Sequence, residues 1–175
     1  MRGMGETRVT ALLRGVLLSI LIFSAPLAAS PGDSFAARIL ASHNQERERI
    51  GQPPLTWSPR LASQAREWAQ SLASRGAFEH SRQRAGAGEN LWMGTAGYYE
   101  PEDMIAGFIS EGRNFRPGQF PNVSQTGNWA DVGHYTQLIW SATREVGCAT
   151  ARGRGNQVLV CRYFSSGNWV GQKVP

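Results

Sequence analysis

The side chains with the clearest potential for chemistry are two imidazoles and two carboxylates, those of His80, Glu89, Glu111 and His134. Glu111 lies seven residues after Met104, which places it on the apolar stripe of a segment with helical spacing. A carboxylate on a buried face needs a partner, because unpaired burial of the charge is costly. The other three residues lie in segments dense with glycine and aromatic residues. If all four meet in one cleft, they would either satisfy one another or hold a divalent metal.

Zinc is the metal that these donors suit, because it accepts histidine nitrogen and carboxylate oxygen and can keep a position open for water. Because the two histidines lie far apart in the sequence, the spacing favours a buried ion-pair cluster without metal. The alternative is a site in which His80 and His134 are the ligands of Zn²⁺ or another divalent cation, with a glutamate as ligand, as support or as base. The sequence contains no serine-hydrolase elbow, phosphate-binding glycine loop, H-E-x-x-H helix or C-x-x-C pair.

The third histidine, His43, falls on the apolar stripe of the first expected helix. We expect a core histidine bonded to backbone or to a neighbouring carboxylate. Trp140 also occupies a periodic, core-like position. Trp92, Trp129 and the pair Tyr98-Tyr99 are expected in loops, where they could line an apolar groove.

Helical spacing of apolar residues predicts the elements that must position these side chains, at residues 35–50, 59–75, from 101 onward and within 132–141. Asp33 or Ser34 can cap the first of these helices. Ser58 and Pro59 supply a cap and a first-turn proline for the second, which Gly76 ends. Burying these stripes requires helices on both sides of a small antiparallel sheet, within a single domain.

The two cysteines, Cys148 and Cys161, lie symmetrically about the turn-like segment 153–156. This spacing predicts antiparallel strands at 145–151 and 157–164, with the cysteines directly opposite each other. Export would favour a disulfide between them, worth at most about 3 kcal/mol because the closed loop is short. The spacing favours a structural bond over a redox site.

Residues 1–29 have the order of a secretory signal peptide. Arg2, Arg8 and Arg14 precede an apolar run at 16–23, which small residues follow up to Ala29. The run is shorter than the ~20 residues that a spanning helix needs, although a retained membrane anchor is the alternative. We therefore expect a leader, a short polar lead at 30–34 and one exported domain at 35–175. That domain would be extracellular or periplasmic, without stable membrane insertion.

The formal net charge of the chain is +5, and removal of the leader, with three arginines and one glutamate, lowers it to +3. The densest basic group consists of Arg144, Arg152, Arg154 and Arg162, around the predicted hairpin. We expect a solvated face there, the alternative being contact with an anionic surface. No feature of the sequence points to nucleic acid.

Residues 133–140 (GHYTQLIW) and residues 159–169 (LVCRYFSSGNW) resemble the first and second signature motifs of the CAP superfamily, the cysteine-rich secretory, antigen 5 and pathogenesis-related proteins. His43-Asn44 with Arg47, and residues 88–91 (GENL), resemble two shorter motifs. All four occur in the family's order, from about residue 35 to 171. Ser165 departs from the family pattern in a loop.

The resemblance implies an α+β fold, a three-layer α-β-α sandwich with a small antiparallel sheet and a large cleft. It places the family's tetrad on His80, Glu89, Glu111 and His134. It also implies structural roles for six motif residues, namely His43, Asn44, Asn90, Trp140, Tyr163 and Asn168. Some members of the family bind divalent metals, zinc especially, and some bind lipids, sterols or glycans.

Three functions follow from this resemblance. The first is a secreted, non-enzymatic binding module with a metal-capable cleft and a lipid, sterol or glycan as ligand. The second is a zinc-dependent hydrolase in which His80 and His134 hold the metal and Glu89 or Glu111 acts as base. The third is an interaction protein whose tetrad only supports the fold.

Overall fold

The structure is a computed structural model that describes Met1 and residues 34–175. The expected signal peptide, apart from Met1, therefore lies outside the described residues. Within residues 34–175, no helix combines the length and apolar character that crossing a bilayer requires.

A four-stranded sheet in the order β1-β4-β5-β2 forms the middle layer of the fold. Strands β4 (Glu145–Gly153) and β5 (Asn156–Phe164) form the predicted antiparallel hairpin. Cys148 lies opposite Cys161, and the two form a disulfide, as expected. The sequence missed β2 (Gly88–Thr95), which pairs antiparallel with β5. It also missed β1 (Thr56–Trp57), which pairs parallel with β4, so the sheet is mixed.

Alternation along the strands gives the sheet two buried faces. One face carries Val146, Cys148, Leu159, Cys161 and Tyr163, and the other carries Leu91, Ala149, Val158 and Val160. Helix α2 (Pro59–Arg75) covers the second face. It packs at backbone distance, since a Cβ at Gly147 would lie 2.3 Å from the amide nitrogen of Ala62. A Cβ at Gly153 would lie 2.4 Å from the carbonyl oxygen of Ala73.

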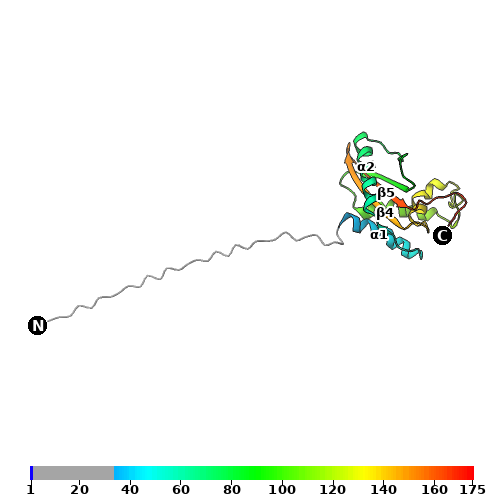
Figure 1. The fold of residues 1–175 in the computed structure, drawn as a ribbon, viewed down its shortest axis with the longest axis horizontal. Helices are drawn as coiled ribbons and strands as arrows, with labels where there is room; N and C mark the ends of the chain where they lie inside the picture. Colours follow the sequence, from blue (N-terminus) through cyan, green and yellow to red (C-terminus); the bar gives the residue numbers. More distant parts are fainter. Residues whose placement is uncertain (2–33) are drawn as a thin grey trace.

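The remaining helices cover the opposite face, so the expected three-layer sandwich is confirmed; Figure 1 shows α1 and α2 on either side of β4 and β5. These helices are α1 (Phe35–Arg49), α3 (Pro101–Ser110) and α4 (Gly133–Leu138). Short 3₁₀ turns follow α3 (η2, Glu111–Asn114) and precede α4 (η3, Trp129–Val132). A second sheet pairs β3 (Gly118–Gln119) with β6 (Lys173–Val174).

Arg47 on α1 is a fully buried cation whose partners are all backbone carbonyls. Its Nη1 donates to the carbonyls of Leu138 (2.9 Å) and Trp140 (3.0 Å), and its Nη2 donates to that of Thr143 (3.3 Å). Burial lowers the pKa of the guanidinium to about 10, which leaves it charged at neutral pH. Arg47 therefore fastens the carboxyl end of α4 to α1.

His43 is a core histidine, as its position on the stripe predicts, with no exposed surface. Its Nδ1 lies 2.8 Å from the carbonyl oxygen of Ile39, and its Nε2 lies 2.9 Å from the hydroxyl of Tyr163. The carbonyl can only accept, so Nδ1 carries the proton and Nε2 accepts from Tyr163. The second partner is thus a phenol rather than a carboxylate. Burial lowers the pKa of His43 to about 4.

Replacing Arg47 with leucine should lower the free energy of unfolding by about 3 kcal/mol or more, because several buried carbonyls lose their donor. Arg47→Lys should recover only part of the lost stability, since an ammonium group cannot reproduce the planar set of N–H donors of the guanidinium. Urea denaturation at pH 7 measures both variants. Arg66, exposed on α2, is the control, and Arg66→Leu should change stability by less than about 0.5 kcal/mol. Equal unfolding midpoints for Arg47→Leu and wild type would contradict this assignment.

His43 should also make the fold sensitive to acid. The unfolded chain binds a proton near the ordinary pKa of 6.5, whereas folded His43 stays neutral down to about 4. Stability therefore falls as the pH drops below 6.5, by about 2 kcal/mol between pH 7 and 5 from this group. Urea denaturation across that range measures the slope, and His43→Gln should flatten it. An unchanged slope in His43→Gln would rule out His43 as its source.

Candidate functional site

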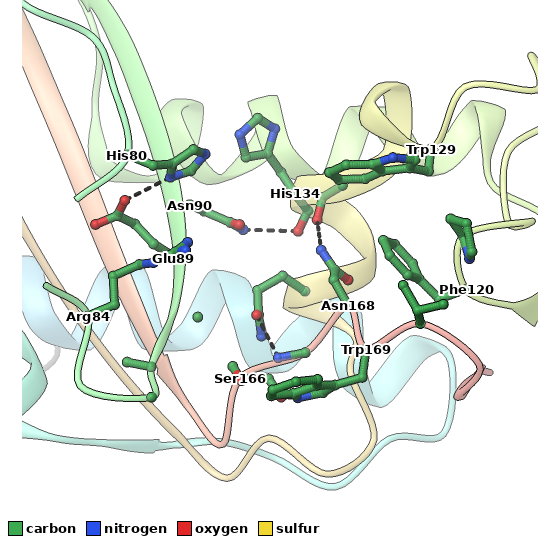
Figure 2. A pocket seen from close by; sticks show the side chains of 18 of the residues that line it. His80, Arg84, Glu89, Asn90, Phe120, Trp129, His134, Ser166, Asn168 and Trp169 are labelled. Carbon is green, nitrogen blue, oxygen red and sulfur yellow. Dashed lines mark hydrogen bonds and ion pairs between the residues drawn. The ribbon is translucent and has the colours of Figure 1, made fainter. Parts of the chain in front are cut away.

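A pocket of about 900 Å³ opens at one end of the sheet. Its walls come from the 80–87 loop, the first residues of β2, residues 120–121, the start of η3, the start of α4 and the 166–170 loop. Figure 2 shows His80, Glu89 and His134 together at this pocket, with Trp129 and Trp169 across from Arg84. Three of the four tetrad residues thus line the pocket.

His80 is half-exposed and is held by a carboxylate that has no exposed surface. Its Nδ1 lies 2.7 Å from Oε1 of Glu89, and the same oxygen accepts the backbone N–H of Ser81 at 2.9 Å. Glu89 on β2 lies directly opposite Arg162 on β5. Nη2 of Arg162 approaches Oε2 of Glu89 to 3.1 Å.

The position of Arg162 corrects a prediction from the sequence. We expected a solvated residue, but its side chain is only 3% exposed. The register of β5 against β2 places it beside a buried acid, which compensates its charge. Burial lowers the pKa of Arg162, and Glu89 opposes that effect. Nε and Nη1 have no hydrogen-bond partner among the described residues, so Glu89 is the principal compensating group.

His134, the second residue of α4, is held by Glu111, which begins η2 directly after α3. Oε1 of Glu111 lies 2.5 Å from Nδ1 of His134, and Oε2 accepts the backbone N–H groups of His134 (2.9 Å) and Tyr135 (3.1 Å). The His134 ring stacks on Phe108, with the ring centroids 5.0 Å apart. Glu111 is partly buried behind His134, outside the pocket lining.

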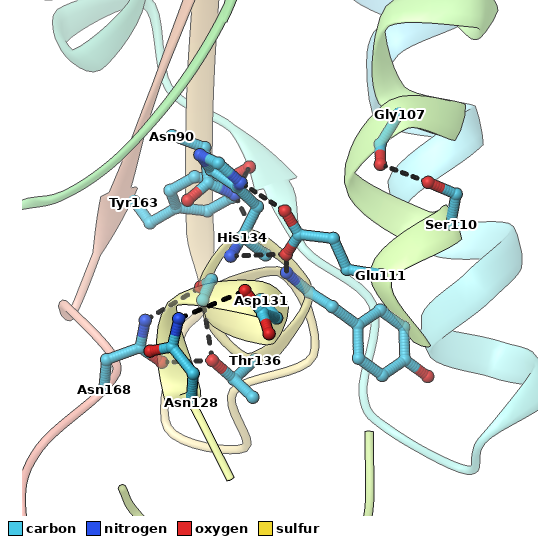
Figure 3. A network of polar contacts seen from close by, with 12 residues as sticks. Asn90, Gly107, Ser110, Glu111, Asn128, Asp131, His134, Thr136, Tyr163 and Asn168 are labelled. Atoms are coloured by element: carbon cyan, nitrogen blue, oxygen red, sulfur yellow. Dashed lines mark hydrogen bonds and ion pairs between the residues drawn. The ribbon is translucent and has the colours of Figure 1, made fainter. Parts of the chain in front are cut away.

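A second set of polar contacts fixes α4 from the pocket side, as Figure 3 shows. Nδ2 of Asn90 donates to the carbonyl of His134 (2.9 Å) and to the hydroxyl of Tyr163 (3.2 Å). Nδ2 of Asn168 donates to the carbonyl of Gly133, and its Oδ1 accepts from the hydroxyl of Thr136. Asn168 has φ 59°, a left-handed conformation that asparagine tolerates well.

The two remaining motif residues lie further from the pocket. The amide of Asn44 bonds both the N–H and the carbonyl of Leu55, which fixes the chain between α1 and β1. Trp140 is buried, and its ring lies so close to Gly167 that a Cβ there would approach Cγ to 2.7 Å. Trp140 therefore supports the 166–170 loop of the pocket, whereas Asn44 supports the chain that leads into β1.

The two His–Glu pairs share a chemistry that suits a metal or a polar ligand. An ionised carboxylate can only accept, so the proton between each pair belongs to Nδ1 of His80 or His134. The Nε2 atoms have no hydrogen-bond partner among residues 34–175. A carboxylate at one ring nitrogen orients the other as a ligand, the usual arrangement of metal-binding histidines.

Among the described residues, one set of three ligand atoms gathers within 4.8 Å, that of His43, Cys148 and Cys161. It is not a metal centre, because the two sulfurs form a disulfide and therefore offer no thiolate. Nε2 of His43 is also engaged by Tyr163. The donors suited to a cation are therefore the two pocket imidazoles, with other positions left to water or ligand.

The α-β-α sandwich with this cleft defines the class of the protein. The sequence profile of the cysteine-rich secretory protein (CAP) family matches residues 40–163, and the chain belongs to this family. The expected family and fold class are thus confirmed.

Particular relatives agree with this assignment. The chain is 33% identical over 171 residues to pathogenesis-related leaf protein 4 of Solanum lycopersicum, covering 97% of this chain and 99% of that protein. It is 32% identical over 148 residues to Golgi-associated plant pathogenesis-related protein 1 of Homo sapiens, covering 82% and 90%. The crystal structure of NaASP2 with Zn²⁺ shares the fold, with a TM-score of 0.65 and 22% identity over 83% of this chain and 88% of that one.

Removing one charge of the Glu89–Arg162 pair should lower the free energy of unfolding more than removing both charges does. Glu89→Gln leaves a buried guanidinium without a counter-charge and should cost about 3 kcal/mol of unfolding free energy. Adding Arg162→Met removes that charge and should restore part of the loss. Arg75→Gln breaks the exposed pair with Glu79 and should cost less than about 1 kcal/mol. Denaturant titration measures these variants. A lower free energy of unfolding for the double variant than for Glu89→Gln would refute a buried ion pair.

Proposed function

We propose that the protein is an exported, non-enzymatic binding module whose cleft holds its ligand at His80 and His134. The observation that carries the proposal is that both imidazoles line one pocket with Nδ1 fixed by a carboxylate and Nε2 without a protein partner. A purely structural tetrad would need no such polar groups directed at a pocket. The half-exposed ring of His80 in particular is available to a ligand.

The state of the two glutamates favours binding over hydrolysis. A general base must be within reach of a water in the cleft and free to take its proton. The side chain of Glu89 is fully buried, which keeps it from water in the cleft: Oε1 accepts from His80 and Ser81, and Oε2, without a hydrogen-bond partner among the described residues, lies 3.1 Å from Nη2 of Arg162 as an ion pair. Both oxygens of Glu111 are occupied by His134 and by backbone N–H groups at the start of α4.

The chemistry of the same two imidazoles, each with Nδ1 held by a carboxylate, suits a divalent cation. Nε2 of His80 and Nε2 of His134 would be its protein ligands, and bound zinc would supply a Lewis acid for an oxygen atom of the ligand. A neighbour of the same fold, NaASP2, has a crystal structure with Zn²⁺, which supports this choice of metal.

Export of the protein is part of the proposal. The charged start, apolar run and small residues of segment 1–29 support a leader. The disulfide is typical of exported proteins, and the family to which the chain belongs is described as secretory.

Calorimetric titration of metal-stripped protein with Zn²⁺ tests the site. Wild type should bind one ion, and His80→Ala or His134→Ala should weaken binding by at least about tenfold, because each removes a ligand. Glu111→Gln should also weaken it by about tenfold through the orientation of His134. Tyr98→Ala, exposed and outside the pocket, is the control and should bind as wild type does.

Two results would count against the proposal. Unchanged zinc affinity in both histidine variants would place any metal elsewhere. Zinc-dependent hydrolysis by wild type that disappears in a folded His134→Ala variant would instead favour the hydrolase.

A further inference from the structure

The pocket has two unlike walls, which together indicate what kind of ligand it takes. One wall carries Arg82 and Arg84, from an exposed loop. Within the described part of the chain, neither arginine side chain has an ion pair or a hydrogen bond. The other wall carries Trp129 and Trp169, which are 46% and 55% exposed. Figure 2 shows Arg84 on one side of the pocket and both tryptophans on the other.

The charge of the pocket favours an anion. Glu89 is the sole carboxylate in its lining, and Arg162 lies 3.1 Å from it as a counter-charge. Arg82 and Arg84 therefore leave an uncompensated positive charge at the rim. A guanidinium is always charged and matches two oxygens of a carboxylate or of a phosphate in a fork, so a carboxylate is among the anions that this wall fits.

The aromatic wall offers rings that are held in place. Trp129 packs edge-to-face on Phe120, with the centroids 5.3 Å apart. Nε1 of Trp169 donates to the carbonyl of Ser166 at 3.0 Å. Each ring is thereby anchored while about half of it stays open to solvent. A flat, amphipathic partner such as a sugar ring can lay its C–H face on such a surface.

The polar groups between the two walls distinguish a sugar from a lipid. The Nε2 atoms of His80 and His134 and the hydroxyl of Ser166 have no side-chain partner among residues 34–175. An acyl chain or a sterol laid over them would leave them buried and unpaired, which is costly. Sugar hydroxyls would pair with them.

We propose that the cleft binds an acidic oligosaccharide, with a uronate carboxylate at Arg82 and Arg84 and a sugar ring stacked on Trp129 or Trp169. The inference rests on the proposed function, since it names the ligand of the same cleft. It predicts recognition of both the charge and the ring, so that neither alone gives full affinity.

Calorimetry with trigalacturonate, its carboxyl-reduced neutral counterpart and decanoate tests the inference. Wild type should bind trigalacturonate at least about tenfold more tightly than the neutral trisaccharide, and less tightly as salt is added. The double variant Arg82→Gln/Arg84→Gln should lose that preference and leave binding of the neutral sugar unchanged. At least one of Trp129→Ala and Trp169→Ala should weaken binding of both sugars by about tenfold, and unchanged affinity in both variants would overturn the stacking.

Matched controls separate these effects from general changes. Arg66→Gln removes one positive charge from the exposed surface of α2, and Tyr98→Ala removes an exposed ring outside the pocket. Both should bind trigalacturonate as wild type does.

Other outcomes overturn the inference in distinguishable ways. Equal affinity for the charged and neutral sugars would remove the role of the arginines. Decanoate or a peptide binding in place of the sugars, with a change at the Trp169 indole N–H signal, would overturn the sugar but keep the binding cleft. If no ligand or metal perturbs Trp129, Trp169 or the two histidines, both the ligand class and the proposed function fail.

Discussion

The site depends on the clamping of one short helix at both ends. Helix α4 has six residues and is too short to be stable alone. The Glu111 carboxylate accepts N–H groups at its amino end, and the Arg47 guanidinium donates to carbonyls at its carboxyl end. An acid at the start and a base at the end are the arrangement that a helix prefers electrostatically. His134 therefore has a fixed backbone before its ring meets any ligand.

The two His–Glu pairs have the same pattern of hydrogen bonds but lie on different secondary-structure elements. In each, one carboxylate binds the ring nitrogen of a histidine and also the backbone N–H of the next residue, Ser81 in one pair and Tyr135 in the other. The ring and its own main chain are thus tied to a single anion. Glu89 supplies that anion from a strand and Glu111 from the end of a helix, so the shared geometry does not come from a shared local fold.

Periodicity predicted those parts of the structure in which burial follows a regular pattern. These parts are the helices and the β4–β5 hairpin. The partial burial of Glu111 also follows from this pattern. Strand β2 was not predicted, because Glu89 and Asn90 put buried polar residues where a strand pattern expects apolar ones. The burial of Arg162 was not predicted either, because it depends on the cross-strand neighbour Glu89, and the strand that carries Glu89 was not predicted. Strands β1, β3 and β6 have two residues each and carry no periodicity.

The close approach of α2 to β4 has a consequence for how such a molecule can diversify. Because Gly147 and Gly153 allow helix and strand to touch through their backbones, that layer tolerates little lateral adjustment. The exposed segment 82–86 is under no comparable constraint, whereas in the 166–170 loop Gly167 and Asn168 are fixed by Trp140 and by α4. Exchange of residues at 82–86 and at the exposed Trp169 and Val170 can therefore alter ligand preference while the rigid platform beneath them is inherited unchanged.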